Sequence, residues 1–525
     1  MKKVSLFITA LAIGASACAQ QNATAVKYGK LITAEDAKKH LSILASDEFE
    51  GRETGKPGAE KAANYIAGEF KKLGLQAPVN GSYFFDVPLA ETKLTISAFS
   101  INGQAFANWT DFFVRGTFPD KTINAADVVF VGYGTAEEIA GTDLGGKIVL
   151  LINEDKPVVG TKTNTSYRAT AARQAILTAI REQKPAVILA ANGEIAGLLK
   201  RFGGQNPSGG GALAIKKPAD NSNAATPVFN VSTTVADAIV KSTGKTYEEL
   251  KTAAAAGKTT QTVKATAEIA FKTTMTDVKA VDVLGFLPGS DPKLKNEVLI
   301  FSAHYDHIGL VTKPGATDKV NNGADDDGSG TTGMLEIAQA FTKAKKDGKG
   351  PRRSVLFLGN VGEEKGLLGS EYYTDHPVYP LANTIADLNI DMIGRVGEEY
   401  IGKPDSANYV YSIGSNMLSS DLNKIGKDAN NTYTKMKLDY KYDDPNDPNR
   451  FYYRSDHYNF ARYGVPIIFY FNGVHADYHQ PGDEVSKINF PLLAKRAQLA
   501  FYTGWELANR DARPVVDKKP AGGTR

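Results

Sequence analysis

Cysteine is almost absent from this sequence, and this excludes most thiol chemistry. The only cysteine among the 525 residues is Cys18. Disulfides and thiolate metal ligands both need cysteine side chains. The rest of the chain therefore cannot rely on disulfides, and any metal bound there must be held by imidazole and carboxylate groups.

Long apolar runs and an excess of one charge are also missing. After the first residues, no segment reaches the ~18 to 20 uninterrupted apolar residues of a membrane-spanning helix. Lysine and arginine number 61 against 58 aspartate and glutamate residues, which gives a net charge of +3. The basic residues are interleaved with acidic ones, so the sequence predicts no nucleic-acid partner.

The first residues carry a leader pattern. Lys2 and Lys3 precede an apolar stretch at 4–13 and the small-residue segment GASACAQ. This pattern predicts a signal peptide over residues 1–19 and an exported protein. The ASA tripeptide before Cys18 favours lipoprotein processing, which would give a periplasmic or outer-membrane protein attached to the membrane only through a lipid. Cleavage after ACA would instead release a secreted protein.

The remaining chain is too long for one core, and its composition changes along its length. Residues 118–270 combine several apolar strand-like runs with one or two helices and contain no histidine. They predict a module inserted between two parts of a main domain, 20–117 and 271–511. Residues 512–525 are rich in proline, glycine and lysine and predict a flexible tail.

Six of the seven histidines lie between 304 and 479, interleaved with acidic residues that follow apolar runs. His304 follows VLIFSA, Glu363 follows SVLFLGNV, Asp391 follows TIADLNI, and His479 comes shortly after VPIIFYF. Open α/β sheets place their sites outside the carboxyl ends of the strands. The series therefore predicts an α/β fold, with a mixed, mostly parallel sheet sandwiched by helices, that gathers these groups at one edge.

These groups have the composition of a two-metal site. Two histidines, a carboxylate able to bridge and two further carboxylates suit ions ~3.5 to 4 Å apart. Imidazole and carboxylate without thiolate favour two zinc ions, with cobalt or manganese as substitutes. Glu363 and Glu364 are adjacent, so their side chains diverge, and one can bind metal while the other exchanges a proton with water.

Several motifs together resemble the double-zinc exopeptidases of the bacterial aminopeptidase type, whose relatives include glutamate carboxypeptidases and the transferrin receptor ectodomain. The resemblance covers the N-terminal helices and nearly all of 280–505, and residues 118–270 resemble the protease-associated domain often inserted in this family. The matching motifs are LASDEFEGRETG, KPGAEKAANYIAGEF, SAHYDHIG, NGADDDGSG, GNVGEEKGLLGS, LNIDMIGR, SDHYNFARYGVPIIFY and DYHQPGDE.

The resemblance implies a role for each candidate residue. It assigns His304 and Asp391 to one zinc ion, Glu364 and His479 to the other, Asp326 to the bridge between them, and Glu363 to general base and acid catalysis.

Further roles follow from the same resemblance. Asp306 would orient His304, and a cis peptide bond would join Asp326 to Asp327. Tyr453 and Asp456 would line the cleft or contact the reacting group, as part of a segment that also contains Ser455. We expect His457 to be a hydrogen-bonded scaffold residue, His475 to lie outside the ligand set, and His307 and His376 to be structural or exposed.

The predicted function is that of an exported zinc aminopeptidase acting on peptides with a free N-terminus. A metal-bridging hydroxide would attack the scissile carbonyl, and Glu363 would pass the proton to the departing amine. The sequence also allows a carboxypeptidase or dipeptidase of the same superfamily, for which Arg52, Arg395 or Arg454 could bind the substrate carboxylate. A glutaminyl cyclase and a catalytically inert receptor-like module are less favoured, because the full ligand set and Glu363 are present.

Overall fold

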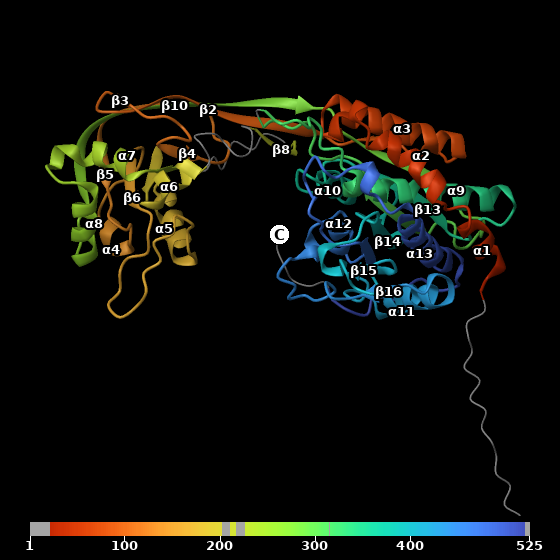
Figure 1. Ribbon diagram of the computed structural model, residues 1–525. Helices are drawn as coiled ribbons and strands as arrows, with labels where there is room; N and C mark the ends of the chain where they lie inside the picture. Colours follow the sequence, from red (N-terminus) through yellow and green to blue (C-terminus); the bar gives the residue numbers. More distant parts are fainter. Residues whose placement is uncertain (1–20, 202–210, 217–225, 314, 520–525) are drawn as a thin grey trace, which may run out of the picture. The chain divides into compact units, whose positions relative to one another are not determined.

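The computed structural model describes residues 21–201, 211–216, 226–313 and 315–519. The chain forms two compact units, a main unit made of Met1–Pro88 with Lys279–Arg525 and an inserted unit made of Leu89–Val278 (Figure 1). The predicted signal peptide and the lipid site at Cys18 lie outside the described residues, so both stay predictions.

The inserted unit begins and ends with a pair of long antiparallel strands. β2 (Leu89–Ile101) pairs with β10 (Gln261–Val278) from Leu89 opposite Val278 to Ile101 opposite Ala267. The unit therefore contains the predicted module 118–270 and extends beyond it at both ends. The alternating apolar residues of KLTISAFSI in β2 indicate a strand but not its partner, because local periodicity carries no information on strand pairing.

The rest of the inserted unit is a curled, β-rich sheet with short helices. Its strand order is β3-β2-β10-β5-β6-β7-β9-β4, with β8 paired to β2. The remaining strands are β3 (Gln104–Ala105), β4 (Phe112–Val114), β5 (Lys121–Phe130), β6 (Ile148–Ile152), β7 (Val187–Ala191), β8 (Ala212–Ile215) and β9 (Val228–Val231). The helices are α4 (Ala136–Ile139), α5 (Ala171–Glu182), α6 (Glu194–Arg201), α7 (Thr233–Val240) and α8 (Tyr247–Ala256). Its identity as a protease-associated domain stays a prediction.

The main unit is built on a mixed sheet of eight strands in the order β1-β11-β13-β12-β14-β17-β15-β16. The strands are β1 (Phe84–Asp86), β11 (Val281–Leu287), β12 (Val298–His304), β13 (Ser354–Asn360), β14 (Thr384–Ile390), β15 (Tyr409–Ile413), β16 (Lys437–Asp439) and β17 (Ile467–Phe471). The four central strands β13, β12, β14 and β17 are mutually parallel. The predicted α/β class with a mixed, mostly parallel sheet is confirmed.

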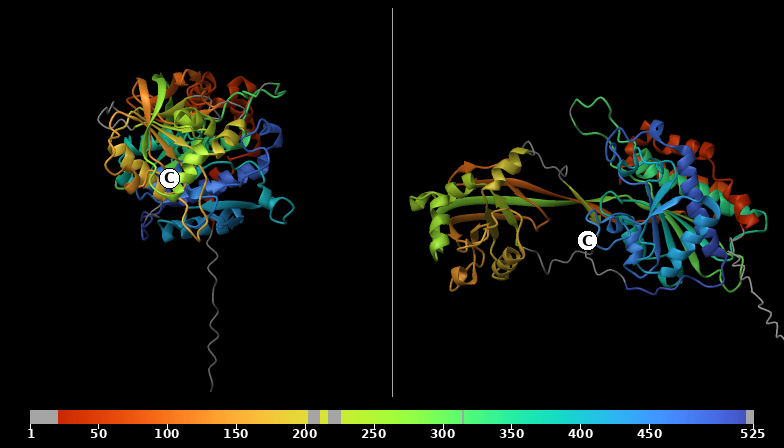
Figure 2. Two further views of the ribbon diagram at one scale, coloured as in Figure 1. Left: turned by 90° about the vertical axis from the view of Figure 1, so that its left-hand side faces the viewer. Right: turned by 60° about the horizontal axis from the view of Figure 1, so that its bottom comes forward.

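Helices cover both faces of this sheet, because its central strands are apolar on both sides. On one face, Phe341 of α9 contacts Phe301 of β12 and Phe501 of α13. On the other face, Tyr373 of α10 and Phe460 of α12 belong to a core cluster with alternate residues of β12 and β13. Figure 2 shows α13 lying along the sheet. The helices are α1 (Ala23–Gly29), α2 (Ala34–Leu44), α3 (Pro57–Leu73), α9 (Gly330–Lys346), α10 (Leu368–Asp375), α11 (Ser420–Ala429), α12 (His457–Ala461) and α13 (Phe490–Asn509).

Local sequence signals explain where two of these helices start and stop. The hydroxyl of Thr33 accepts a hydrogen bond of 3.1 Å from the backbone N–H of Asp36, so Thr33 caps α2. Helix α3 ends before Gly74, whose φ of 83° lies in the left-handed region that glycine adopts without strain. Among the described residues, no helix combines the length and apolar character needed to cross a membrane.

The C-terminal segment beyond α13 is partly held against the main unit. Asp517 accepts hydrogen bonds from the backbone and hydroxyl of Ser420. The amino group of Lys518 donates to the carbonyl oxygen of Asn416 at 2.7 Å. The predicted flexible tail 512–525 is therefore anchored up to at least Lys518, because its polar side chains find partners near α11.

Candidate metal centre

The candidate ligands leave the sheet at one edge. In the parallel ladder, His304 at the end of β12 pairs with Asn360 at the end of β13. Strand β14 ends at Ile390, directly before Asp391. Gly362 turns the chain after β13 with a φ of 74°, and Glu363 and Glu364 follow this turn. Strand register thus brings together side chains that are distant in the sequence.

The first group of ligand atoms comes from His304, Glu363 and Asp391. All three offer an atom within 4.8 Å of the others. The Nε2 atom of His304 lies 3.6 Å from a carboxylate oxygen of Asp391 and 3.9 Å from one of Glu363. His304 is buried, and its Nε2 has no hydrogen-bond partner among the described residues.

The second group surrounds Glu364. His479 Nε2 lies 3.0 Å from Asp326 Oδ2 and 3.1 Å from Glu364 Oε2. His307 also belongs here, since its Nδ1 lies 2.8 Å from Glu364 Oε1 and 3.7 Å from Asp326 Oδ2. His307, Asp326 and Glu364 offer ligand atoms within 4.8 Å of one another.

The structure decides between the two roles that were expected for His307, structural or exposed. It is fully buried and contacts a candidate ligand, so it is not exposed. Its position three residues after His304, on the same strand-end loop, was the available signal. The resemblance to the zinc exopeptidases assigned His479, and not His307, as a metal ligand beside Glu364.

Asp326 lies between the two groups. Its Oδ1 is 3.4 Å from His304 Nε2, and its Oδ2 is 3.0 Å from His479 Nε2. Burial would raise the pKa of Asp326, but these imidazoles outweigh burial and hold the pKa well below its usual range. Asp326 is therefore an ionised carboxylate with one oxygen directed toward each group, as a bridging ligand requires.

The charge of the cluster fits divalent cations. Four carboxylates, those of Asp326, Glu363, Glu364 and Asp391, are gathered in a largely buried space. Burying this much negative charge is costly unless cations compensate it. The Nε2 atoms of His304 and His479, both close to these carboxylates, are directed at the same space. The residues present therefore fit two zinc ions.

Glu363 differs electrostatically from its neighbour. Burial raises the pKa of Glu363 well above the usual glutamate value, and the charges of Glu364 and Asp391 raise it further, although His304 opposes them. The pKa of Glu364 is lowered, because contacts with His307 and His479 outweigh burial. Of the two adjacent carboxyl groups, Glu363 is the one suited to holding a proton.

The acidic turn before α9 is tightly constrained. A cis peptide bond joins Asp326 to Asp327, as predicted. Asp327 Oδ1 accepts hydrogen bonds from the backbone of Gly330 at the start of α9, at 2.8 Å, and of Met392, at 3.0 Å. The carboxylate of Asp483 accepts from the backbone N–H of Asp326 at 3.1 Å. These contacts fix the position of the Asp326 side chain.

Asp306 is fully buried next to His304. The Nδ1 atom of His304 lies 3.1 Å from the backbone oxygen of Asp306 and 3.8 Å from its carboxylate. That carboxylate accepts hydrogen bonds from the hydroxyl of Thr54, at 2.6 Å, and from the backbone of Glu363, at 3.3 Å. Asp306 therefore links the His304 loop to the Glu363 loop. The backbone carbonyl of Asp306 lies nearer to His304 than its carboxylate does.

The residues of segment 453–457 differ in how they contact the metal centre. The hydroxyl of Ser455 donates to Asp391 Oδ2 at 2.6 Å and so orients this candidate ligand. Asp456 is buried and accepts from Ser370 at 2.5 Å, and burial raises its pKa to about 7. Tyr453 packs against Tyr458 and does not line the pocket beside the ligands.

The remaining histidines have scaffold contacts. Burial lowers the pKa of His457 to about 3, and its Nε2 is hydrogen-bonded to the carbonyl of Tyr452 at 2.8 Å. His475 Nε2 lies 3.2 Å from Asp325, away from the four site carboxylates. His376 is exposed at the end of α10. These positions agree with the predicted roles of the three residues.

A pocket opens directly beside the candidate ligands. Asp326, Glu363 and Asp391 form one part of its wall. The rest of the wall is mostly apolar and aromatic, with one cationic residue, and consists of Met392, Phe451, Arg454, Phe469, Phe471, Val474 and Tyr478. The ring of Tyr478 stacks on that of His479 at 3.9 Å between centroids.

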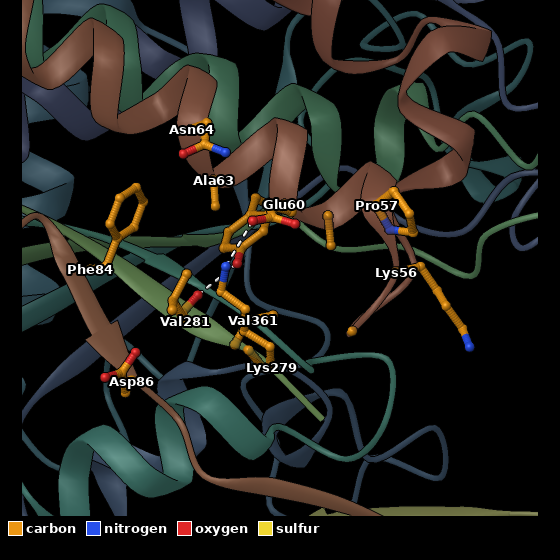
Figure 3. Close-up of a pocket in the computed structure, with 14 residues that line it drawn as sticks. Lys56, Pro57, Glu60, Ala63, Asn64, Phe84, Asp86, Lys279, Val281 and Val361 are labelled. Atoms are coloured by element: carbon orange, nitrogen blue, oxygen red, sulfur yellow. Dashed lines mark hydrogen bonds and ion pairs between the residues drawn. The ribbon is translucent and has the colours of Figure 1, made fainter. Parts of the chain in front are cut away.

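Another cavity, of about 270 Å³, lies near the start of α3 (Figure 3). The Lys279–Glu60 ion pair of 2.7 Å borders it, and the hydroxyl of Tyr305 donates to the carbonyl of Val281. None of the candidate ligands lines this cavity. The metal centre is thus served by the smaller pocket, although Tyr305 directly follows His304.

Comparison with known sequences now identifies the main unit. Residues 282–503 match the model of peptidase family M28, and they include every candidate ligand. These residues are an M28 peptidase domain. The predicted family is therefore confirmed, and the matched range contains the cluster that the structure assembles.

Individual relatives match the M28 part of the chain at low identity. Aminopeptidase YwaD of Bacillus subtilis (strain 168) is 26% identical over 235 residues, covering 42% of this chain and 44% of that protein. Leupeptin-inactivating enzyme 1 of Streptomyces exfoliatus is 28% identical over 243 residues, covering 42% of this chain and 47% of that protein. The match thus spans about half the length of these relatives.

A solved structure matches the whole chain in fold. The aminopeptidase from Aneurinibacillus sp. strain AM-1 covers 94% of this chain and 98% of its own, with a TM-score of 0.54 and 19% sequence identity. At this identity the match supports the shared fold. It extends beyond the M28 domain and so includes the inserted unit.

Proposed function

We propose that this protein is a zinc-dependent aminopeptidase that removes the N-terminal residue from peptides. The placement of Asp326, with one carboxylate oxygen near His304 and the other near His479, carries this proposal. That arrangement suits a carboxylate shared by two adjacent zinc ions. The names of the M28 relatives, which include an aminopeptidase of Bacillus subtilis, support the reaction class.

Each residue group has a part in the proposed reaction. His304 and Asp391 would hold one zinc ion, Glu364 and His479 the other, and Asp326 both. Bound zinc supplies Lewis acidity, which lowers the pKa of water and polarises a carbonyl. Glu363 accepts a proton from the attacking water and donates it to the departing amine, a role that suits its raised pKa.

His307 has a place in the same proposal. Its hydrogen bond to Glu364 leaves the other oxygen of that carboxylate directed at His479. His307 therefore holds Glu364 in the orientation needed for metal binding, and carboxylates that bind metals are commonly oriented in this way.

A substrate panel tests the function. The protein is assayed with amino-acid anilides and with N-blocked peptides, each with and without a chelator. We expect cleavage of the free-amine compounds alone, and its loss on chelation. Cleavage of N-blocked peptides from the C-terminus would instead indicate a carboxypeptidase. No cleavage of any compound by the zinc-loaded protein would refute the hydrolase assignment.

A further inference from the structure

The three arginines that sequence analysis offered as carboxylate binders differ in whether they are available. Arg52 is fully buried, and its guanidinium donates to four backbone carbonyls. The acceptors are the carbonyls of Leu44, Tyr305, Asn322 and Gly323. Four of its five N–H groups are used within the protein and the side chain is buried, so Arg52 is not available to a substrate.

Arg395 already forms ion pairs within the protein. Its Nη2 lies 2.8 Å from Asp477, and its Nη1 lies 3.5 Å from Asp483. These two contacts fix the loop that carries His479. A substrate carboxylate would have to displace an existing ion pair.

In the part of the chain that the structure describes, Arg454 is neither buried like Arg52 nor paired with carboxylates like Arg395. It lines the pocket beside Asp326, Glu363 and Asp391, and it is exposed to solvent. Its guanidinium carbon lies 4.8 Å from the ring centre of Phe451, and its Nη2 donates to the hydroxyl of Tyr478 at 3.3 Å. Among the described residues, no carboxylate forms an ion pair with it.

The aromatic contacts hold Arg454 in place without pairing its charge with a carboxylate. Stacking on Phe451 orients the plane of the guanidinium and leaves N–H groups along its edge available. A planar guanidinium fixed in this way matches the two oxygens of a carboxylate. Arg454 is the only cationic residue in the wall of a pocket whose other charged groups are all acidic.

We propose that Arg454 binds a carboxylate of the substrate and thereby determines specificity. This inference rests on the proposed aminopeptidase function. Without Arg454, the carboxylates of Asp326, Glu363 and Asp391 would disfavour an anionic group in this pocket. With it, the protein accepts a substrate whose carboxylate lies near the scissile bond.

Two kinds of substrate provide such a carboxylate. One is a peptide that begins with glutamate or aspartate, whose side chain would enter the pocket. The other is a dipeptide, whose C-terminal carboxylate lies one residue beyond the scissile bond. Two matched pairs of compounds separate them: glutamyl and glutaminyl anilides for the side chain, and leucylglycine and leucylglycinamide for the C-terminus.

The test compares kcat/KM within each pair for the zinc-loaded wild type and for Arg454→Met. We expect the preference for the charged member of one pair to fall about tenfold in the variant, in line with the loss of one charge-assisted hydrogen bond. Arg454→Lys should retain part of that preference. The pair that responds identifies the source of the carboxylate.

Arg450→Met provides the matched control. Arg450 stacks on Tyr453 at 4.8 Å in the same segment but does not line the pocket. Its removal should leave both preferences unchanged. If Arg454→Met changes neither preference by more than about twofold, or if Arg450→Met has the same effect, the role of Arg454 is refuted.

A binding measurement keeps this inference separate from the proposed function. The same four compounds are titrated calorimetrically into zinc-loaded Glu363→Gln protein, with and without Arg454→Met. Weaker binding of only the charged member of a pair supports the role of Arg454, and equal binding refutes it. Failure of the wild type to cleave any of the four would count against the peptidase function alone.

Discussion

The Nε2 atom of His479 lies 3.0 Å from the Oδ2 atom of Asp326, although the two residues come from distant segments of the chain. Asp326 belongs to the acidic turn before α9, whereas His479 lies in the loop after β17. The loop of His479 is held by Arg395 through Asp477, and the acidic turn is held by backbone contacts to Asp483. Two loops from distant parts of the chain, both held through Asp483, therefore meet at one carboxylate, which makes Asp326 the centre of the site.

Removal of the central carboxylate should affect both metal ions. We expect Asp326→Asn to bind clearly less zinc per chain than Asp391→Asn, because Asp391 contacts only the His304 group. Zinc content after dialysis, measured by atomic emission, checks this. The exposed Asp428→Asn serves as the control and should keep the wild-type content. Equal zinc loss in Asp326→Asn and Asp391→Asn would contradict the bridging role.

Glu363 should contribute to catalysis but not to metal retention. Glu363→Gln removes the proton acceptor with little change in shape, so we expect kcat to fall about 10²- to 10⁴-fold while zinc content stays near that of the wild type. Steady-state kinetics and metal analysis of the same preparation measure both effects. By contrast, Glu364→Gln should lose zinc. Undiminished activity in Glu363→Gln would overturn its assignment as the base.

Chelation should destabilise the main unit. The buried carboxylates repel one another when no cation compensates them, and a ligand that binds only the folded state at 100 to 1,000 times its Kd stabilises it by about 3 to 4 kcal/mol. We therefore expect a lower Tm after treatment with a chelator, measured by differential scanning calorimetry. Zinc should restore the Tm, and magnesium should not. An unchanged Tm would argue against bound metal.

Arg52 should be essential for stability although it contacts no substrate. Arg52→Met leaves four buried carbonyls without their donor, and we expect the free energy of unfolding to fall by about 3 kcal/mol or more. Arg462→Met, which breaks an exposed ion pair with Asp375, should cost less than about 1 kcal/mol. Urea unfolding of both variants provides the comparison, and similar midpoints would contradict the role of Arg52.

His457 should make stability depend on pH. Burial lowers its folded pKa from 6.5 to about 3. Above pH 6.5 both states are neutral at this residue, so its contribution is fully present. Below 6.5 the unfolded chain binds a proton and the folded chain does not, so stability falls by roughly 1.4 kcal/mol per pH unit down to about pH 3.

The variant His457→Gln isolates this effect. Its amide can still donate to the carbonyl of Tyr452 but does not titrate. The difference in unfolding free energy between the wild type and the variant, measured from pH 7 to pH 4.5, should change in favour of the variant as the pH falls. A difference independent of pH would show that folding does not lower the pKa of His457.

Much of the site was predictable because its residues stand at recognisable positions in the sequence. His304 and Asp391 each adjoin the end of a continuous apolar run, and such runs form buried parallel strands. Once the strands are parallel, their carboxyl ends meet at one edge. The order of the ligands along the chain therefore sufficed to predict the cluster.

The inserted unit shows where local sequence is not enough. Its limits at Leu89 and Val278 depend on the pairing of β2 with β10, which no composition change marks. The alternation of apolar residues in β2 is the same whichever strand it pairs with. Pairing is decided by long-range packing, so the boundary could be located only in the folded structure.

The sequence by itself determined the family, the fold class and the ligand types, because strand periodicity and motif spacing are local properties. Only the tertiary structure decided that His307 contacts Glu364, and that Arg52 and Arg395 are held by backbone carbonyls or carboxylates. Among the described residues, Arg454 forms no ion pair with a carboxylate. The reason is physical. A charged side chain has the same identity in the sequence wherever it lies, but its pKa and its availability depend on partners that come from distant segments.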